Sequence, residues 1–478
     1  MLDVVSRTLG LGSRSTRLPQ YAAAIVANVV AIGYGVVQGW ASPSLPLLRS
    51  VDTAVDAQPV TVEQESWLGS LVFLAALVAS PVYSHINHSL GRKMAGYLSA
   101  VPMIVGWLLV TFATSVTHLL IARFIMGISL SGINVFITMY VGEIAEDNIR
   151  GALGNLRGLF CDIGIIIVYL VAPYLTIHNT GAASLAIPVL FLFCYFWLPE
   201  SPMFLMGKGD SEKALDAFMW LRGGDAKLAQ DELSKLNYMM TSKSNVQEMG
   251  IKDLLSVRGT RKALTIALVL ATVQQFSGMN VVFSYCETIF EMTGNSLSPY
   301  VSSIVFSLVN LLGSLCSCIL ADIAGRRLIL ITTQVLQGIS LGSLGVYLFL
   351  RHLNFDVTVV GVLPLVCVSV YCFCVVAGPA NMFYVVLSET LRPEARGIAM
   401  SITSSFLWLL AFLSTKFYST LVDLLEPHGC FWLFTAVSFA GAIFTFFQIP
   451  ETKNRSLESI LRELNGDPPE DCKSEASS

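Results

Sequence analysis

The most constraining feature of this sequence is a series of long stretches that contain no charged residue. They cover 18–48, 66–91, 94–122, 124–142, 263–286, 292–321, 328–350, 357–388 and 427–450. A helix needs about 20 apolar residues to cross the hydrocarbon core of a bilayer. Charged residues make up only 13% of the chain, whereas soluble domains average about 25%. The chain is therefore predicted to cross a membrane many times.

Two further stretches bring the predicted spans to twelve. Residues 163–199 hold the end of one span and all of the next, and 397–422 is interrupted only by Lys416. Unpaired backbone amides are not tolerated in lipid, so the spans must be helices or a closed barrel, and uninterrupted runs of this length favour helices. We predict an all-α membrane protein with twelve transmembrane helices in two six-helix halves.

Lys and Arg predict how the chain lies in the membrane. If the N-terminus is cytoplasmic, Arg92, Arg150 and Arg326 fall in inner loops, and the clear outer cases are only Arg49 and Arg351. Basic residues are enriched in cytoplasmic loops, so both termini are expected inside the cell. The expected segments are a cytoplasmic tail at 1–17, half-domains at 18–199 and 263–450, a cytoplasmic loop at 200–262 and a second tail at 451–478.

The loop between the halves should form short helices. The segment "SEKALDAFMWLRGGDAKLAQDELSKL" mixes apolar residues with charged ones around a Gly-Gly break at 223–224. This pattern is typical of amphipathic helices at a membrane surface. We expect these helices to lie on the inner face of the membrane.

Three sequence elements occur twice, in the same order. "SLGRK" at 89–93 matches "AGRR" at 324–327, "EIAEDNIRG" at 143–151 matches "ETLRPEARG" at 389–397, and "PES" at 199–201 matches "PET" at 450–452. Each lies at the predicted cytoplasmic end of a helix. Two related halves around a central site are a known transporter plan, in which one half rocks against the other.

The charged residues of these repeats are candidates for a cytoplasmic gate. Glu143 and Arg150 are seven residues apart, about two turns of a helix, as are Glu389 and Arg396. A salt-bridge network that can rearrange suits a switch, and we expect it to hold the inner side closed when the cavity faces outward. Alternatively, the basic residues only anchor the loops. The expected gate consists of Glu143, Arg150, Glu389, Arg396, Arg92, Arg326, Glu200 and Glu451.

Three carboxamides within seven residues stand out in an apolar segment. The motif "QQFSGMN" places Gln274, Gln275 and Asn280 between Ala263 and Cys286, where no residue is charged. Burying such groups unpaired is costly, so they should meet something polar. An uncharged, hydroxyl-rich ligand fits neutral amides, and hydrogen bonding between helices is the structural alternative. Gly278 suggests a broken helix at this point.

Other function classes lack support in the sequence. No HExxH, GxxxxGK[ST] or GxSxG motif is present, and the six histidines are scattered. The net charge of -4, without a Lys/Arg run, gives no sign of a nucleic-acid partner. We expect neither an enzyme nor a bound cofactor or metal, and a monomer whose partners are a small solute and the lipid bilayer.

The motifs together resemble the sugar porter family of the major facilitator superfamily over nearly the whole chain. The resemblance is carried by "GRK", "DIAGRR", "RFIMG", "YVGE", "RGALG", "PESPMFL", "QQFSGMN" and "PETKNRSLE". The first-span segment "GWASPSLP" resembles the trehalose-transporter-like branch found in insects. The resemblance implies the major facilitator fold and transport of a sugar by alternating access, and we expect a multi-pass protein of the plasma membrane.

The resemblance also implies a set of sugar-binding residues. Gln274, Gln275, Asn280 and Asn310 align with amides that bond sugar hydroxyls. In the seventh span, Tyr285 keeps one of the family's two tyrosines, and in the eleventh Trp408 keeps the ring of its Asn-Trp pair. The expected substrate-binding residues are Gln274, Gln275, Asn280, Asn310, Tyr285, Trp408, Asp162 and Met382.

Several positions depart from the family pattern. Asn381 and Met382 replace a proline and a stacking tryptophan, Leu407 replaces an asparagine, and Gly158 replaces the fifth-span glutamine. Asp162 lies four residues after Gly158, about 40° around the helix, and should share its cavity face. An acid within a membrane span indicates function, although a structural ion pair with Arg123 is the alternative.

These features favour facilitated diffusion of a sugar, trehalose or a hexose such as glucose. Proton-linked sugar porters carry an acid in the first span, and 18–48 contains none. Two alternatives remain open: a proton-coupled sugar symporter that uses Asp162, and a membrane sugar sensor that does not transport.

Overall fold

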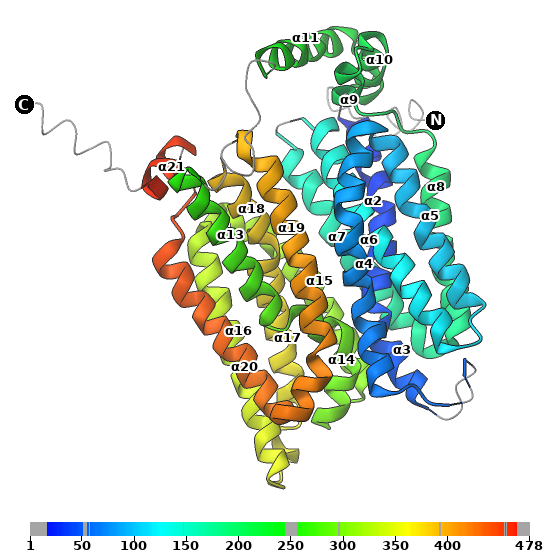
Figure 1. Cartoon of the computed structure of the whole chain (residues 1–478), viewed down its shortest axis with the longest axis vertical. Coiled ribbons are helices and arrows are strands. Elements are labelled where there is room, and N and C mark those ends of the chain that lie inside the picture. The colour runs from blue at the N-terminus through cyan, green and yellow to red at the C-terminus, as the bar shows by residue number, and fades with distance from the viewer. Residues whose placement is uncertain are drawn as a thin grey trace, which may run out of the picture.

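A computed structural model describes residues 17–50, 55–56, 58–146, 148–243, 256–294, 297–391, 393–453, 455 and 457–465. Within these ranges, twelve helical spans are long and apolar enough to cross a membrane. They form two bundles that stand side by side, with short helices at one end (Figure 1). The prediction of twelve spans with short helices between two halves is confirmed.

The first bundle contains six spans. Its first span bends at Trp40 and so consists of two helices, α2 and α3. The helix bounds are α2 Leu18–Gly39, α3 Ala41–Arg49, α4 Val62–Ser89, α5 Arg92–Thr111, α6 Val116–Ile144, α7 Arg150–Val171 and α8 Ile177–Tyr195. A capping box starts α4, because Thr61 Oγ1 accepts from the Gln64 N–H and the Gln64 side chain accepts from the Thr61 N–H.

Three short helices follow the first bundle. They are α9 Pro202–Gly207, α10 Ser211–Leu221 and α11 Ala226–Lys243. Side chains cap α9 and α10: Ser201 accepts from the Phe204 N–H, and Asp210 accepts from the Lys213 N–H. These helices lie at the end of the molecule that is uppermost in Figure 1. We call it the α9–α11 end, and the other end, where α3 and α14 lie, the α3–α14 end.

The second bundle repeats the six-span plan with more breaks. Its helices are α13 Arg258–Phe276, α14 Met279–Thr293, α15 Pro299–Ala324, α16 Arg326–His352, α17 Leu363–Val375, α18 Asn381–Thr390, α19 Pro393–Lys416 and α20 Tyr418–Gln448. A π-helical segment, Val376–Ala380, joins α17 to α18 and contains Pro379, which has no N–H for a regular helix. A last helix, α21 Leu457–Asn465, packs on α13.

The break predicted at Gly278 is present. Helix α13 ends at Phe276 and α14 starts at Met279. Between them Gly278 has φ +92°, and an added Cβ would stand 2.8 Å from the Phe434 ring. Only glycine suits both the left-handed backbone and this close approach. The carboxamides of "QQFSGMN" therefore sit on either side of a helix break.

Candidate functional site

A cavity of about 1530 Å³ lies between the two bundles. Helices α4, α6 and α7 line it from the first bundle, and α15, α18 and α19 from the second. His88 near the end of α4, Gly151 at the start of α7 and Arg326 at the start of α16 are among its lining residues. All three lie near the α9–α11 end, so the cavity extends to that end of the molecule.

The opposite end of the cavity is closed by contacts between α4 and α19. Lys416 Nζ lies 2.6 Å from Glu63 Oε1 and donates to Ser66 Oγ over 2.7 Å. The same ammonium stands 4.3 Å from the centre of the Trp67 ring, and Trp67 packs against Phe412 at 6.0 Å. These contacts join the two bundles.

Helices α3 and α14 add to this closure. Ser42 Oγ accepts from the Glu287 N–H over 3.0 Å. Arg49 makes two short bonds to Glu65 and lies 3.9 Å from Glu291 on α14. The bundles are thus in contact at the α3–α14 end and separated by the cavity at the α9–α11 end.

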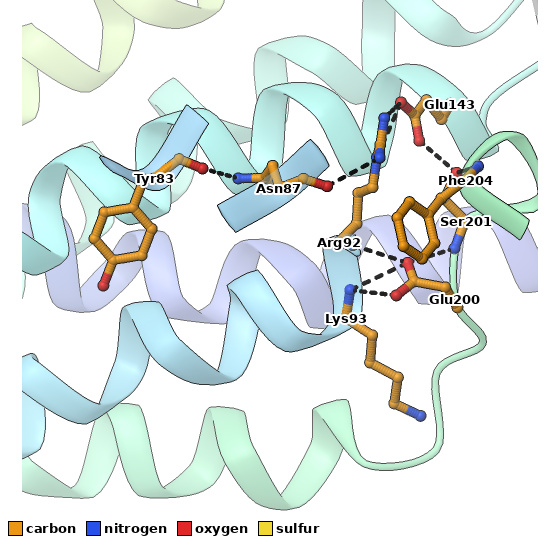
Figure 2. A network of polar contacts seen from close by, with 8 residues as sticks. All are labelled: Tyr83, Asn87, Arg92, Lys93, Glu143, Glu200, Ser201 and Phe204. Carbon is orange, nitrogen blue, oxygen red and sulfur yellow. Dashed lines mark hydrogen bonds and ion pairs between the residues drawn. The ribbon is translucent and has the colours of Figure 1, made fainter. Parts of the chain in front are cut away.

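A polar cluster holds the first bundle together at the α9–α11 end. The Arg92 guanidinium donates to Glu143 Oε1 through Nη2 (2.6 Å) and Nε (3.1 Å), and Nη1 donates to the Asn87 carbonyl (3.0 Å). Ser201 Oγ donates to the other Glu143 oxygen, and the Phe204 ring lies 5.4 Å from the guanidinium. Figure 2 shows how α4, α5, α6 and the segment before α9 meet here.

Glu200 completes this cluster by capping α5. Its carboxylate accepts from the N–H groups of Arg92, Lys93 and Ser201 (Figure 2). Such an anion at a helix N-terminus is stabilised by the helix dipole. Burial raises the pKa of the Glu200 carboxyl, and the three N–H bonds oppose that rise. Gly91, with φ +96°, makes room, since a Cβ there would stand 2.4 Å from Glu200 Oε2.

The second bundle repeats the cluster with the residues that the sequence repeat predicts. Arg326 Nη2 donates to Glu389 Oε1 over 3.0 Å. Glu451 accepts from the N–H groups of Arg326, Thr452 and Lys453. Gly325, with φ +85°, lies against Glu451 as Gly91 lies against Glu200. The two clusters thus share one design.

The proposed gate differs from expectation in one respect. Glu143 and Arg150 are not on one helix, because α6 ends at Ile144 and α7 begins at Arg150, and Arg150 donates to the Ala145 carbonyl. Glu389 and Arg396 are likewise divided between α18 and α19, and the side chain of Arg396 is outside the described residues. The ion pairs among the described gate residues, Arg92 to Glu143 and Arg326 to Glu389, each lie within one bundle.

Asp162 and Asn310 are brought together across the bundles. Asn310 Nδ2 on α15 donates to Asp162 Oδ1 on α7 over 2.6 Å, and Ser314 Oγ donates to Oδ2. Asp162 is 6% exposed and does not line the cavity, although Ser314 does. In this arrangement α15 covers the Asp162 carboxylate, which does not reach the cavity that Gly158 lines, and a role for Asp162 in binding stays a prediction. Nor does Asp162 pair with Arg123, which donates to the Leu68 and Val37 carbonyls.

The carboxamides of the helix break bond mainly to their own segment. Asn280 Nδ2 donates to Gln275 Oε1 over 2.6 Å, and Gln274 Nε2 lies 3.5 Å from Met279 Sδ. Gln274 Oε1 is buried and has no hydrogen-bond partner among the described residues. All three amides are 5–6% exposed. In this arrangement they belong to the wall of the second bundle and not to the lining of the cavity.

Of the remaining predicted site residues, one lines the cavity and two pack against aromatic rings elsewhere. Met382 lines the cavity. Trp408 stacks on Phe73 at 6.3 Å, across the contact between α19 and α4. Tyr285 is buried at a kink of α14, 5.1 Å from the Tyr418 ring. Of the expected substrate residues with described side chains, Met382 alone lines the cavity as it stands.

The structure also brings to the cavity residues that the sequence analysis did not select. Asn134, Asn155 and Arg157 line it. The available signal was the spacing of Gly151, Gly154, Asn155 and Gly158 on α7, which places small and polar residues on one helical face. That face lies along the cavity.

Two six-span bundles around a central cavity, open towards one end and closed at the other, are the architecture of a membrane transporter. The family model "Sugar (and other) transporter" matches residues 27–464. The chain belongs to this sugar transporter family, and it is a transporter rather than an enzyme.

Known proteins of similar sequence and structure agree with this assignment. The chain is 32% identical to the facilitated trehalose transporter Tret1 of Bombyx mori (93% of this chain, 86% of that protein) and 31% identical to Tret1 of Apis mellifera ligustica (94% and 88%). It spans about half the length of the Drosophila mojavensis Tret1, to which it is 30% identical. The inward-open structure of the xylose transporter XylE from E. coli superimposes with a TM-score of 0.77 at 19% identity, covering 92% of this chain and 99% of that one. This likeness confirms the major facilitator fold.

Proposed function

We propose that this chain is a uniporter that moves trehalose or a hexose such as glucose down its gradient by alternating access. The observation that carries the proposal is the cavity between the bundles, which reaches one end and is sealed at the other by Lys416, Glu63 and Trp67. A solute in such a cavity changes sides when the closed end opens and the open end closes.

Likeness to the insect proteins supports the choice of solute. Relatives that are 31–32% identical over most of their length carry the name facilitated trehalose transporter. The buried amides Gln275 and Asn280 and the exposed amide Asn155 provide the neutral donors and acceptors that sugar hydroxyls need. No acid lies on α2 or α3, the two described helices of the first span, and this favours a uniporter over a proton-coupled carrier.

Labelled uptake tests the proposal. Oocytes that express the chain are given radiolabelled trehalose or glucose at acidic and neutral pH, with and without a proton uncoupler. A facilitator gives saturable uptake that reaches equilibrium and does not respond to the uncoupler. Absence of uptake of both sugars, with the protein present at the surface, would contradict the proposal and favour the sensor.

The second candidate is a proton-coupled symporter, and Asp162 is the reason to keep it. Its carboxylate joins the bundles through Asn310 and Ser314, so protonation would remove the charge that both bonds favour. Proton binding would then change the strength of the contact between α7 and α15, and in this way couple to transport. Uphill uptake that the uncoupler abolishes, and that Asp162→Asn converts into equilibrating uptake, would support this candidate over the first.

We further propose a monomer in the plasma membrane with both termini in the cytoplasm. In this orientation the α9–α11 end is cytoplasmic and the cavity faces inward. The gate assignment follows, because the Arg92 and Arg326 clusters then lie on the cytoplasmic side of each bundle. The test is a tag at each terminus of the chain in intact cells. If both tags react with an external reagent only after the cells are permeabilised, this orientation is supported.

A further inference from the structure

We propose that the cavity also carries a polyhydroxylated anion, that is, a sugar with one carboxylate or phosphate group, and that Arg157 binds its charge. The inference rests on the proposed function, because it takes this cavity as the transport pathway. It adds a class of solute that neutral carboxamides alone would not select.

The described lining of the cavity carries positive charge without acid. Arg157 and Arg326 are among the lining residues, and neither Asp nor Glu is. Arg326 is paired with Glu389, which reduces its pull on a solute. Like charges in a cleft with apolar walls raise the local concentration of the opposite ion. The cavity should therefore favour an anion over a cation.

Arg157 is the basic residue placed deepest along α7. It follows Arg150, the first residue of the helix, by seven positions, or about 10 Å at 1.5 Å per residue. Among the described residues its guanidinium makes no hydrogen bond or ion pair. An arginine within a membrane span is costly unless it is paired or faces a polar cavity. Here a bound anion would be its partner.

An acid close to Arg157 is already engaged elsewhere. Asp162 lies within electrostatic range of Arg157. Its two oxygens, however, accept from Asn310 and Ser314 on α15. The guanidinium therefore keeps its five donors for a solute. The planar arrangement of these donors matches a carboxylate or phosphate in two parallel bonds.

The wall around Arg157 leaves room for a ligand. Added Cβ atoms at Gly151, Gly154 and Gly158 would meet nothing within 4 Å. The guanidinium is thus flanked by open space along α7. The replacement of the family's glutamine by Gly158 widens the cavity at this depth.

Neutral groups for the hydroxyls lie in the same cavity. The Asn134 and Asn155 carboxamides line it, and within the described part of the chain neither makes a hydrogen bond to the protein. Each offers two donors and an acceptor to hydroxyl groups. A cation at one point and amides around it fit a solute that is both charged and hydroxylated.

Transport by the purified full-length chain in liposomes tests this inference. The radiolabelled solutes are glucuronate, glucose 6-phosphate, glucose and trehalose. We expect saturable uptake of at least one anion in the wild type. Arg157→Gln should lower anion uptake about tenfold, since it removes charge-assisted hydrogen bonds to the anion, while uptake of the neutral sugar stays within about twofold. Arg157→Lys should restore part of the anion uptake.

A matched control distinguishes the loss of a charge in the cavity from the loss of a charge elsewhere on the protein. Arg258→Gln removes an exposed arginine at the start of α13 that does not line the cavity. This variant should carry anions as the wild type does. Equal reconstitution of all variants is verified before uptake is compared.

Each outcome decides the matter. Uptake of glucuronate alone identifies a carboxylate site and uptake of glucose 6-phosphate alone a phosphate site, and both results support the inference. Uptake of neutral sugar without either anion, or equal loss of both kinds of uptake in Arg157→Gln, overturns the inference and leaves the proposed function intact. Failure of every solute overturns the proposed function and this inference with it.

Discussion

Gln275 and Asn280 hold each other in place across the break between α13 and α14. Their side chains are 2.6 Å apart and almost fully buried. A buried amide that loses its partner costs about 1–3 kcal/mol of desolvation. The hydrogen bond of this pair therefore couples the conformation of the helix break to the position of the carboxamides that we propose to contact the sugar.

Gln275→Leu should abolish saturable sugar uptake while surface expression persists. The change removes the acceptor of Asn280 and a proposed sugar contact. The matched control is Gln337→Leu, which removes another buried amide, and this amide has no hydrogen-bond partner within the described part of the chain. That control should transport normally. Normal uptake by Gln275→Leu would show that the amide does not serve the sugar.

Gly158→Gln should lower the KM for a neutral sugar, because it restores an amide at a position where the cavity is open. The expected change is about tenfold or less for one neutral hydrogen bond. Helix propensity also improves by up to about 1 kcal/mol. As a contrast, Gly164→Ala on the same helix should reduce expression, since its Cβ would stand 2.1 Å from the Ile32 carbonyl oxygen. A KM for the sugar that is higher in Gly158→Gln than in the wild type would contradict binding of the sugar at this part of the cavity.

At the scale of elements, the Arg92 and Arg326 clusters share a design but differ in burial. The side chains of Arg92 and Glu143 are 7% and 11% exposed, and those of Arg326 and Glu389 are 16% and 27% exposed. Removing one member of a buried ion pair costs about 3–5 kcal/mol, and exposure to water lowers that cost.

Arg92→Ala should therefore lower the Tm of the purified protein more than Arg326→Ala does. In the first variant, of its bonds to described residues, Glu143 keeps the one from Ser201. Arg351→Ala, at an exposed site where the guanidinium donates to the Met292 carbonyl, serves as the control and should change Tm least. The measurement is thermal unfolding in one detergent. A larger fall for Arg326→Ala would contradict the ranking by burial.

Elements were easier to predict from the sequence than the contacts between them. The apolar runs and Gly278 predicted the spans and the broken helix, because these features depend on short stretches of chain. The bond between Asp162 and Asn310 joins residues that are 148 positions apart, and no local pattern signals it. For the same reason the sequence analysis did not select Arg157, whose place in the cavity depends on how the two bundles pack.

At the scale of the whole molecule, the sequence repeat predicted two related halves but not their relative position. The repeated residues form the two matched clusters. An alternating-access protein has at least two arrangements of the same sequence, so the sequence alone does not favour one of them. The structure has the arrangement in which α4 and α19 are joined by Lys416 and Glu63.

Alternating access requires that α4 and α19 separate at this closed end during transport. The direct measurement combines Glu63→Cys with Lys416→Cys and joins the two thiols with a cleavable bifunctional reagent, with each single variant as control. Sugar uptake should be lost in the cross-linked double variant, persist in the treated single variants and return on cleavage. Undiminished uptake with the cross-link complete would contradict alternating access through this contact.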